Sequence, residues 1–579
     1  MKIKISIFAL LTFILFCCSK DDKPVEIQTG NIKLEIVFND GTSPILDATV
    51  SIDAISKQKV TGVDGLVTFE NIEVGNYEVS VSIPFSDIIT KENIVVEADK
   101  TTNELILIDY PKPITPEKID IDKWLNACYE SLVSDDIFGA KGYATYWGDV
   151  GVDVFMGNIN LNFPTRKMDT YDFGSTDKII EDIWTNHYQV IRKTTIGIEA
   201  IETSEYVTEL NTDENIAKAE FKFLRALTYF NLVKLFGNPV LVTSTEIPSD
   251  NNSVVQDPLK VYEFIEADLI FAESNLSQSN IKNKASVSAA QALLGKVYLQ
   301  MAGFPLLQSD KYLKALEQFN KLDGLYALET NYGDIFNSDK TANSSEVIFS
   351  IDFTIPNDSN LKSWDWFYWG PLEVTERDFF LLAPNFIKGY FKNPNDLDIP
   401  VSFPLNIEDS RFFENIVSFT IQNNASVNAE DTANWRPYKF SENYQEGKSF
   451  QLPYLRYADI LLMIAEVENA INGGPTIKAY DAINKVRRRA FGNTENDVTP
   501  GLNQQDFLDV LFEERLLELC FEGHRKDDLI RIQKLESVIE NHNANSSQNM
   551  KNYQSHKHIL PIPELEINLN PGVFQNPGY

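Results

Sequence analysis

Cysteine and histidine are scarce in this 579-residue sequence, which has four of the first and five of the second. Cys128 and Cys520 stand alone inside apolar stretches, so the sequence offers no disulfide framework. His556 and His558 alternate, the other histidines are isolated, and none has the spacing of metal ligands. We therefore predict no metal site and no cofactor, and we expect Cys128 and Cys520 to be small buried hydrophobic residues.

Long apolar runs are also scarce, apart from one near the start. Ile5 to Phe16 follows Lys2 and Lys4, which is typical of a secretory signal, and the run is too short for a transmembrane helix. The run 15–18, Leu-Phe-Cys-Cys, resembles a bacterial lipobox, which implies lipidation of Cys18. Lys-Asp-Asp at 20–22 resembles the surface-export tag of Bacteroidetes lipoproteins, which implies an outer-membrane protein that faces the cell exterior. The alternative is an ordinary secretory signal with incidental cysteines.

Positive charge is in short supply. The chain has 51 Lys and Arg against 84 Asp and Glu, a net charge of −33 at pH 7. Removal of a signal peptide at 1–17 leaves 49 against 84, or about −35. Such a surface repels phosphates and anionic lipid head groups, which argues against nucleic acid as a partner. No single acidic block stands out, so the excess is expected to keep an exported protein soluble.

After a polar tether at 18–29, a small β-domain is predicted at 30–110. Alternating segments recur with turn signals between them, which favours an antiparallel β-sandwich; the segments are 32–38, 48–52, 67–69 and 77–81. The run 61–65, Thr-Gly-Val-Asp-Gly, resembles a motif of the carboxypeptidase regulatory-like, transthyretin-type domain. No clustered His, Cys or carboxylate set has ligand spacing here, so we assign this domain a spacer role.

Beyond the prolines at 111–116 the period becomes helical. The predicted helices lie near 121–134, 176–201, 213–236, 258–277, 285–302, 311–322, 455–472, 477–491 and 504–533. The segment 213–236 is apolar on nearly all faces and must be packed between neighbours. Helix pairs at this spacing indicate tetratricopeptide-like stacking. The irregular sequence from about 323 to 455 is expected to be functional surface.

Several motifs in this helical part resemble the SusD/RagB family of outer-membrane nutrient-binding lipoproteins. They are 219–230, 235–237, 455–463, 514–525, 560–563 and 575–579. The resemblance implies a mainly α-helical, tetratricopeptide-containing domain with long loops over 112–579. It also implies a partner, a SusC-type TonB-dependent transporter, to which glycans or other nutrients are delivered. Two departures are Lys526 before the aspartate at 527, where the family often has an aromatic residue, and the β-domain ahead of the helical body.

A run of aromatic residues gives the strongest candidate for ligand binding. Three of the seven tryptophans lie within six residues, at Trp364, Trp366 and Trp369, together with Asp365 and Tyr368. The face of a sugar ring stacks on flat aromatic groups, while its hydroxyls need nearby polar groups. Nearly continuous aromatic residues cannot all face one core, so we expect at least one to reach solvent. The alternatives are packing in the core and contact with the transporter.

A second aromatic patch lies earlier, at 143–155. The resemblance implies that such an early segment contributes to the binding face, and Tyr146 and Trp147 are its candidate residues. The alternative for Trp147 is packing between the first helix and the helical stack.

Three glutamates have a spacing that could serve catalysis. Glu514, Glu518 and Glu522 recur every four residues on one helical face, and paired carboxylates serve glycoside hydrolysis. Arginines at 487–489, 515 and 525 favour a structural salt-bridge network instead, and Asp459 and Glu466 are expected to be buried and paired with arginine. We predict no catalytic residues and a glycan-binding protein. The alternatives are a scaffold that binds peptide or protein and, less favoured, a surface glycosidase.

Overall fold

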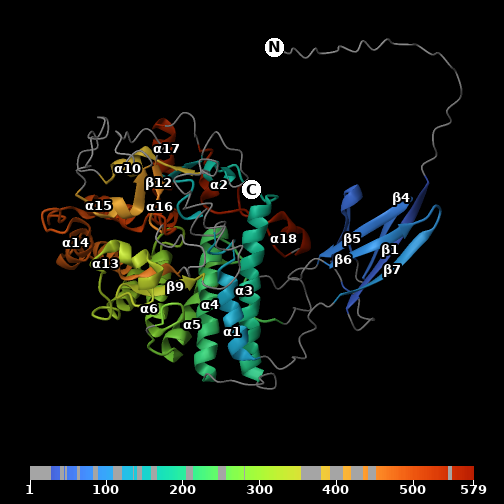
Figure 1. Ribbon diagram of the computed structural model, residues 1–579, viewed down its shortest axis with the longest axis horizontal. Coiled ribbons are helices and arrows are strands. Elements are labelled where there is room, and N and C mark those ends of the chain that lie inside the picture. The colour runs from blue at the N-terminus through green and yellow to red at the C-terminus, as the bar shows by residue number, and fades with distance from the viewer. Residues whose placement is uncertain are drawn as a thin grey trace, which may run out of the picture. The chain divides into compact units, whose positions relative to one another are not determined.

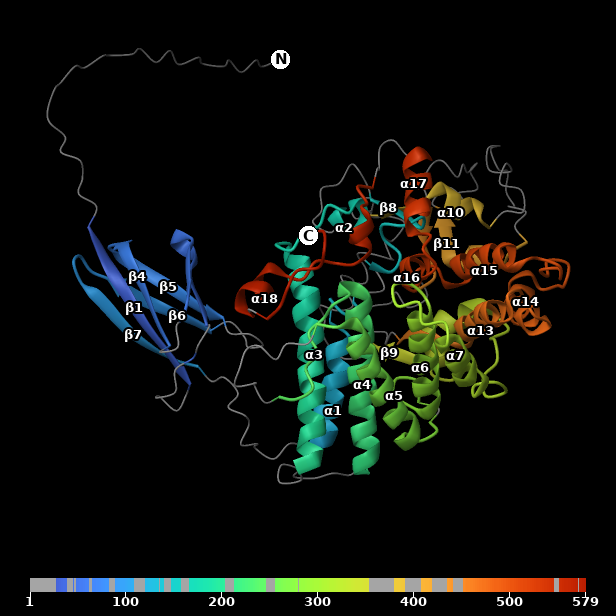
Figure 2. The same cartoon turned by 180° about the vertical axis from the view of Figure 1, so that it is seen from behind.

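A computed structural model of the chain describes residues 28–38, 45, 48–61, 65–82, 89–108, 120–134, 136–139, 147–157, 166–203, 213–245, 256–279, 281–353, 380–390, 408–418, 435–440, 451–545, 551–570 and 572–579. The chain divides into two compact units, Met1–Lys112 and Pro113–Tyr579. The first holds strands and the second is mainly helical (Figures 1 and 2).

The first unit consists of two sheets. One has the order β4-β1-β7 and the other the order β3-β2-β5-β6. The strands are β1 (Thr29–Phe38), β2 (Thr49–Ile52), β3 (Lys57–Val60), β4 (Leu66–Glu73), β5 (Gly75–Ser82), β6 (Ile89–Val96) and β7 (Thr101–Ile108), with a short 3-10 helix at Asp53–Ile55. Alternate residues face inward; Ile32, Leu34 and Ile36 of β1 are fully buried. The predicted β-region is confirmed as a set of alternating strands, while β3, β6 and β7 were not predicted. The prediction that all strands are antiparallel is wrong, because β1 pairs with β7 in parallel along its length.

The edges of the two sheets are joined by side chains. On one side Lys57 and Lys59 of β3 donate to backbone oxygens of β4, at 3.1 and 2.7 Å. On the other side Lys91 of β6 donates to the backbone oxygen of Leu105 on β7 at 3.0 Å, and Thr102 donates to that of Val95 at 2.6 Å. Lysines at strand edges disfavour pairing with another chain.

The second unit is built from packed helices. They are α1 (Ile121–Leu132), α2 (Arg166–Thr170), α3 (Lys178–Thr203), α4 (Glu214–Phe236), α5 (Pro258–Asn275), α6 (Val287–Ala302), α7 (Lys311–Asn320), α8 (Ser338–Thr341), α10 (Pro384–Lys388), α11 (Arg411–Asn415), α13 (Tyr457–Asn472), α14 (Ile477–Phe491), α15 (Gln504–Leu519), α16 (Arg525–Arg531), α17 (Leu535–Asn545) and α18 (Glu564–Leu569), with 3-10 turns at Tyr332–Phe336 and Ser555–His558. Successive helices from α3 to α7 pack against each other, as Figures 1 and 2 show for α3 to α6. The predicted tetratricopeptide-like, mainly α-helical class is confirmed.

Local sequence explains where these helices begin and how closely they pack. Asp213 accepts hydrogen bonds from the first turn of α4, and Ser286 does the same for α6. The central helix α4 is buried on nearly all faces and packs against α1, α3 and α5, as its sequence required. Gly197 of α3 lies against the Phe221 ring of α4, where a Cβ atom would come within 2.5 Å. This glycine therefore sets how near the two helices approach.

One predicted helix is divided. The pattern at 504–533 predicts a continuous helix, but α15 ends at Leu519 and α16 begins at Arg525. Phe521 and Gly523 adopt positive φ angles of 65° and 78°, which a helix does not allow. The residues between the two helices, 520–524, form a turn that brings Gly523 to the interior of the unit. Among the described helices, none is long and apolar enough to cross a membrane.

Short strands complete the unit. They are β8 (Phe155–Gly157), β9 (Val347–Asp352), β10 (Phe380–Leu382), β11 (Ile416–Ser418), β12 (Trp435–Pro437) and β13 (Gln451–Arg456). They form the antiparallel pairs β8 with β10, β9 with β13 and β11 with β12.

Candidate functional site

Most of the predicted ligand-binding residues lie outside the described part of the chain. Trp364, Asp365, Trp366, Tyr368 and Trp369 fall in the range 354–379, and Tyr146 and Cys18 are also outside it. Their proposed roles therefore remain predictions.

The described structure does place the two ends of the range 354–379. Before it, β9 ends at Asp352, which pairs with Gln451 of β13. After it, β10 begins at Phe380, which pairs with Gly157 of β8. The aromatic run therefore lies in sequence between two antiparallel pairs. In the second pair, β10 lies beside β8, which begins at the last residue of the other predicted aromatic patch, 143–155.

The structure contradicts the prediction that Trp147 contributes to the ligand-binding face. Its side chain is 1% exposed, so it presents no ring face to a ligand. Phe173 packs edge-on against it at 6.3 Å between ring centres, and the Lys526 ammonium lies 4.2 Å from its ring centre. The structure therefore favours the alternative of packing for Trp147, with Phe173 and Lys526 as its described contacts.

Glycines explain why the chain turns inward at Trp147. A Cβ atom on Gly148 would come within 2.2 Å of the Cα of Gly523, so the two backbones touch. Gly148 accepts a hydrogen bond from the backbone N–H of Lys526 at 2.8 Å. This contact joins the early segment to the turn between α15 and α16.

Two buried groups at this contact have strongly shifted pKa values. Burial, with a smaller contribution from Lys551, lowers the pKa of Lys526 to about 7. Burial raises the pKa of Asp149 to about 7, although the backbone N–H groups of Gly523 and Arg525 act in the opposite direction. A buried amine without an acceptor is costly to charge, which accounts for the first shift.

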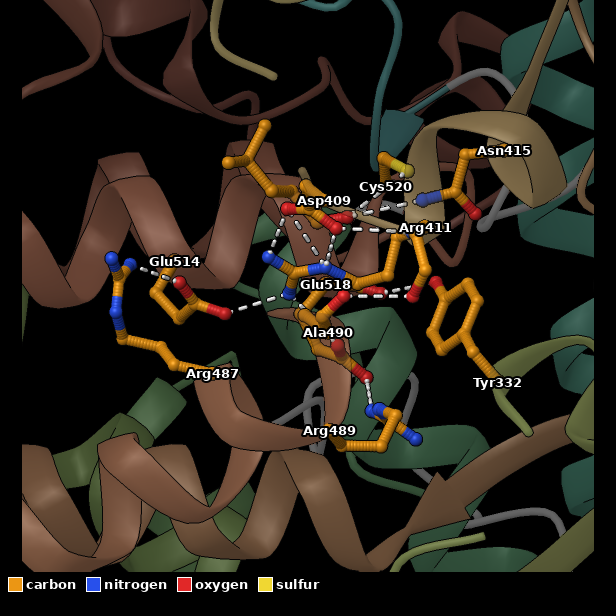
Figure 3. A network of polar contacts seen from close by, with 12 residues as sticks. Tyr332, Asp409, Arg411, Asn415, Arg487, Arg489, Ala490, Glu514, Glu518 and Cys520 are labelled. Carbon is orange, nitrogen blue, oxygen red and sulfur yellow. Dashed lines mark hydrogen bonds and ion pairs between the residues drawn. The ribbon is translucent and has the colours of Figure 1, made fainter. Parts of the chain in front are cut away.

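A buried charge network occupies the carboxylates of α15 (Figure 3). The Arg411 guanidinium donates from Nη1 to Glu514 at 2.6 Å and to Glu518 at 2.9 Å, and from Nη2 to Asp409 at 2.7 Å. Glu514 also accepts from Arg487 at 2.7 Å. Arg411, Glu514 and Glu518 are all buried. The predicted structural salt-bridge network is confirmed, although Arg515 and Arg525 pair with aspartates instead of with these glutamates.

The network continues through Arg456. Its Nη1 donates to Glu346 at 2.9 Å and to Glu518 at 2.6 Å, and its Nε donates to Glu522 at 2.7 Å. Lys439 donates to Glu522 at 2.5 Å. These contacts tie β13 and the segment 435–440 to α15 and the turn after it.

The electrostatics of the network do not suit acid catalysis. Burial alone would raise the pKa of Glu518, but Arg489, Arg456 and Arg411 outweigh it, so the pKa is lowered. The pKa of Glu522 is likewise lowered by Arg456 and Lys439 against the effect of burial. A general acid in glycoside hydrolysis needs a raised pKa. These carboxylates therefore hold the fold together and do not supply an acid.

A second network lies beside the first. Asp459 accepts from Arg515 at 2.8 Å and from Lys296 at 2.9 Å, and Glu466 is paired with Arg531. The expectation that Asp459 and Glu466 are buried and paired with arginine is confirmed. A small cavity nearby is lined in part by Lys234, Lys296, His524 and Asp527. It has room for roughly one water molecule, so it cannot take a sugar ring.

The described residues give no support for a metal site or for a nucleophilic cysteine. In the part of the chain that the structure describes, no group of His, Cys, Asp and Glu could hold a metal ion. Cys128 and Cys520 are free and buried, as predicted, and burial raises their thiol pKa values to about 12 and about 11. Thiols with such pKa values are not nucleophiles at neutral pH.

Two features were not predicted from the sequence. One is the pairing of Asp153 with Arg525, which are 372 residues apart, and the other is the role of Arg411. Arg525 lies within a motif of the resemblance, but nothing in the spacing pointed to Asp153. Arg411 lies in the irregular part of the sequence, where no period indicates burial.

Comparisons with known proteins agree with this fold. The profile of the SusD family matches residues 414–579, and a second profile, described as "Starch-binding associating with outer membrane", matches residues 109–299. Together the two matches span more than half of the chain and lie almost entirely within the helical unit. The chain belongs to the SusD family.

Relatives of the chain carry SusD names. SusD-like protein P25 of Formosa agariphila is 24% identical, over 81% of this chain and 94% of its own length. The starch-binding protein SusD of Bacteroides thetaiotaomicron is 23% identical, over 62% of this chain and 72% of its own length.

Solved structures show the same SusD fold. A SusD homologue from Bacteroides thetaiotaomicron has a TM-score of 0.66 at 24% identity, over 79% of this chain and 96% of that one. A laminarin-binding SusD-like protein has a TM-score of 0.60 at 24% identity, over 79% of this chain and 99% of that one.

Proposed function

We propose that this SusD-family chain is a surface lipoprotein that captures an oligosaccharide or glycan and delivers it to a SusC-type TonB-dependent transporter in the outer membrane. The observation that carries the proposal is the match of residues 109–299 to a family described as starch-binding and associated with the outer membrane. It is supported by names that mention starch or laminarin among the similar proteins.

The proposed ligand-binding residues are those of the aromatic run, Trp364, Asp365, Trp366, Tyr368 and Trp369. Their support is chemical, since flat aromatic groups next to a carboxylate suit both the face and the hydroxyls of a sugar. Tyr146 stays a candidate beside them. Trp147 is no longer one, because it is buried.

The transporter, the anchor and the role of the β-domain belong to the same proposal. Lipidation of Cys18 would hold the protein at the outer membrane, and the segment 18–29 would be its tether. The likeness of 30–110 to a transthyretin-type domain suggests a spacer between tether and helical unit.

Calorimetry on the soluble chain from Ser19 to Tyr579 tests the ligand class. The protein is titrated with oligosaccharides derived from laminarin and from starch. Oligosaccharides derived from cellulose, which have a different glycosidic linkage, serve as a comparison. Saturable binding of at least one set supports the proposal. If no glycan binds while a peptide, or a protein other than the transporter, co-purifies from solubilised outer membranes, the alternative of a peptide- or protein-binding scaffold is favoured.

A further inference from the structure

The small cavity beside the second charge network is lined by residues of α4, α6 and α16. Its volume is about 20 Å³, and one water molecule needs roughly 10–15 Å³. The polar part of its lining includes Lys234 of α4, Lys296 of α6, and His524 and Asp527 at the start of α16. Cavities lined by apolar groups alone stay dry, whereas a water in a polar cavity typically makes about three hydrogen bonds. Both the size and the lining therefore fit one water.

The charges around the cavity favour a neutral ligand. Lys234 donates to Oδ2 of Asp527 at 2.6 Å. Burial lowers the pKa of Lys234 and raises that of Asp527, and this pair has no net charge on whichever partner its proton lies. Each of the other three cations in the lining has its own carboxylate; the pairs are Lys296–Asp459, Arg515–Asp528 and Arg531–Glu466. Cations and carboxylates therefore balance, which disfavours a chloride or a sodium ion in the cavity.

A hydrogen-bond donor of His524 has no acceptor among the described residues. The ammonium nitrogen of Lys296 lies 3.1 Å from Nδ1 of His524. Because an ammonium group only donates, Nδ1 is the acceptor of this bond. Burial and the Lys296 charge lower the pKa of His524 to about 3, so the ring is neutral at pH 7 and has its one proton on Nε2. Buried donors are almost always satisfied by protein or by ordered water, and no described residue accepts from this N–H.

We propose that the cavity is a binding site for one water molecule, which accepts a hydrogen bond from Nε2–H of His524 and donates one to Oδ1 of Asp527. Lys234 occupies the other oxygen of Asp527, Oδ2. His524 is connected to α6 through Lys296, and Asp527 is connected to α4 through Lys234. The water therefore joins the two contacts by which the start of α16 is held to α6 and to α4.

Crystallography of the soluble chain from Ser19 to Tyr579 tests the nature of the ligand. We expect one ordered water in the cavity, at roughly 2.7–3.2 Å from Nε2 of His524 and 2.5–3.0 Å from Oδ1 of Asp527. A crystal soaked in bromide, which replaces chloride and gives an anomalous signal, should show no peak at this place. A bromide peak would identify an anion site, and a cavity without density would show that no ligand is held. Either result would overturn the proposal.

The position of the histidine proton gives a second test in solution. In protein labelled with ¹⁵N-histidine, nitrogen–proton couplings distinguish a ring that is protonated on Nε2 from one protonated on Nδ1. We expect His524 to be protonated on Nε2 and not to titrate between about pH 5 and pH 8. His187 is the internal control, because it is also buried but its Nδ1 lies 2.7 Å from the backbone oxygen of Ile183, which places its proton on Nδ1.

His524→Gln and His187→Gln each remove one signal and so assign the two histidines. A proton on Nδ1 of His524, or titration of His524 in this pH range, would overturn the proposal even if the cavity holds a water.

Discussion

The ammonium nitrogen of Lys526 lies over the ring of Trp147, 4.2 Å from the ring centre, and has no hydrogen-bond acceptor among the described residues. The ring centre of Tyr171 lies 5.1 Å from the same nitrogen. Two aromatic faces thus take the place that a carboxylate usually has beside a buried lysine. Aromatic faces compensate less of the cost of burying the charge than a carboxylate does, and the lowered pKa of Lys526 reflects this.

Replacing Lys526 by methionine should stabilise the protein. The pKa of Lys526 is about 7 in the fold, against the ordinary value of 10.5, so the unfolded chain binds the proton more tightly between these pH values. The wild type therefore loses stability as pH falls from about 10.5 to 7. We expect Lys526→Met to raise the free energy of unfolding by about 1–3 kcal/mol at pH 7 and by much less at pH 10. Urea denaturation of both proteins at pH 7 and pH 10 measures the change in the free energy of unfolding. An equal gain in stability at the two pH values would contradict the lowered pKa of Lys526.

Removing Arg411 should be costly. Arg411→Met leaves Asp409, Glu514 and Glu518 with fewer positive partners in the interior, and such changes cost about 3–5 kcal/mol. Arg488→Met is the matched control, because Arg488 is partly exposed and its pair with Asp497 should contribute less than about 1 kcal/mol. Chemical denaturation of both variants checks this. A loss below 1 kcal/mol in Arg411→Met would mean that the network is redundant.

Trp147 and the aromatic run should behave in opposite ways. Trp147→Ala creates a cavity in the core and should cost about 3–5 kcal/mol of stability. Replacing Trp364, Trp366 or Trp369 by alanine should weaken glycan binding by about 1–3 kcal/mol for the residue that stacks, with stability nearly unchanged. Thermal melts and calorimetry on each variant separate the two. If all three tryptophan variants lose stability but still bind glycan, the aromatic run belongs to the core. If stability and binding are both unchanged but less transporter co-purifies, the run belongs to the interface with the transporter.

Lipidation can be tested with an adjacent control. A fatty-acid probe should label the wild type and Cys17→Ala but not Cys18→Ala, because cleavage before Cys18 makes that thiol the acceptor. Protease added to intact cells should degrade the wild type. Undiminished label on Cys18→Ala, or full protection from protease, would refute the anchored and outward-facing arrangement.

The helical unit is expected to fold alone. Contacts within the chain separate Met1–Lys112 from Pro113–Tyr579, so a fragment of residues 112–579 keeps its own core. It should melt in one cooperative transition close to that of the soluble chain. Aggregation of the fragment, where the longer chain melts cooperatively, would show that the helical unit depends on the β-region.

The regular part of the fold could be predicted because its periods are strong. The helices at 213–236, 258–277 and 477–491 agree with α4, α5 and α14 to within two residues at each end. The break between α15 and α16 could not be predicted, because Phe521 takes a positive φ angle that its residue type disfavours and tertiary contacts impose. Burial of Trp147 likewise involves a distant part of the chain, because the neighbouring Gly148 lies against Gly523.

The chemistry of the site was less accessible from sequence. Pairing of α15 carboxylates with arginine followed from their abundance, but the partner Arg411 comes from sequence without a period. Asp153 pairs with Arg525 by long-range contact, and no local rule relates two residues at that separation. The candidate binding residues at 364–369 rest on composition alone, because they lie outside the described range.

The lysines that join the sheet edges of the first unit also affect how neighbouring molecules can associate. Lys57 and Lys59 cover one open side of the two sheets, and Lys91 covers the other. Among the described residues, such lysines make the edge strands poor templates for pairing with a neighbouring molecule. We therefore expect this unit to stay monomeric at high local density.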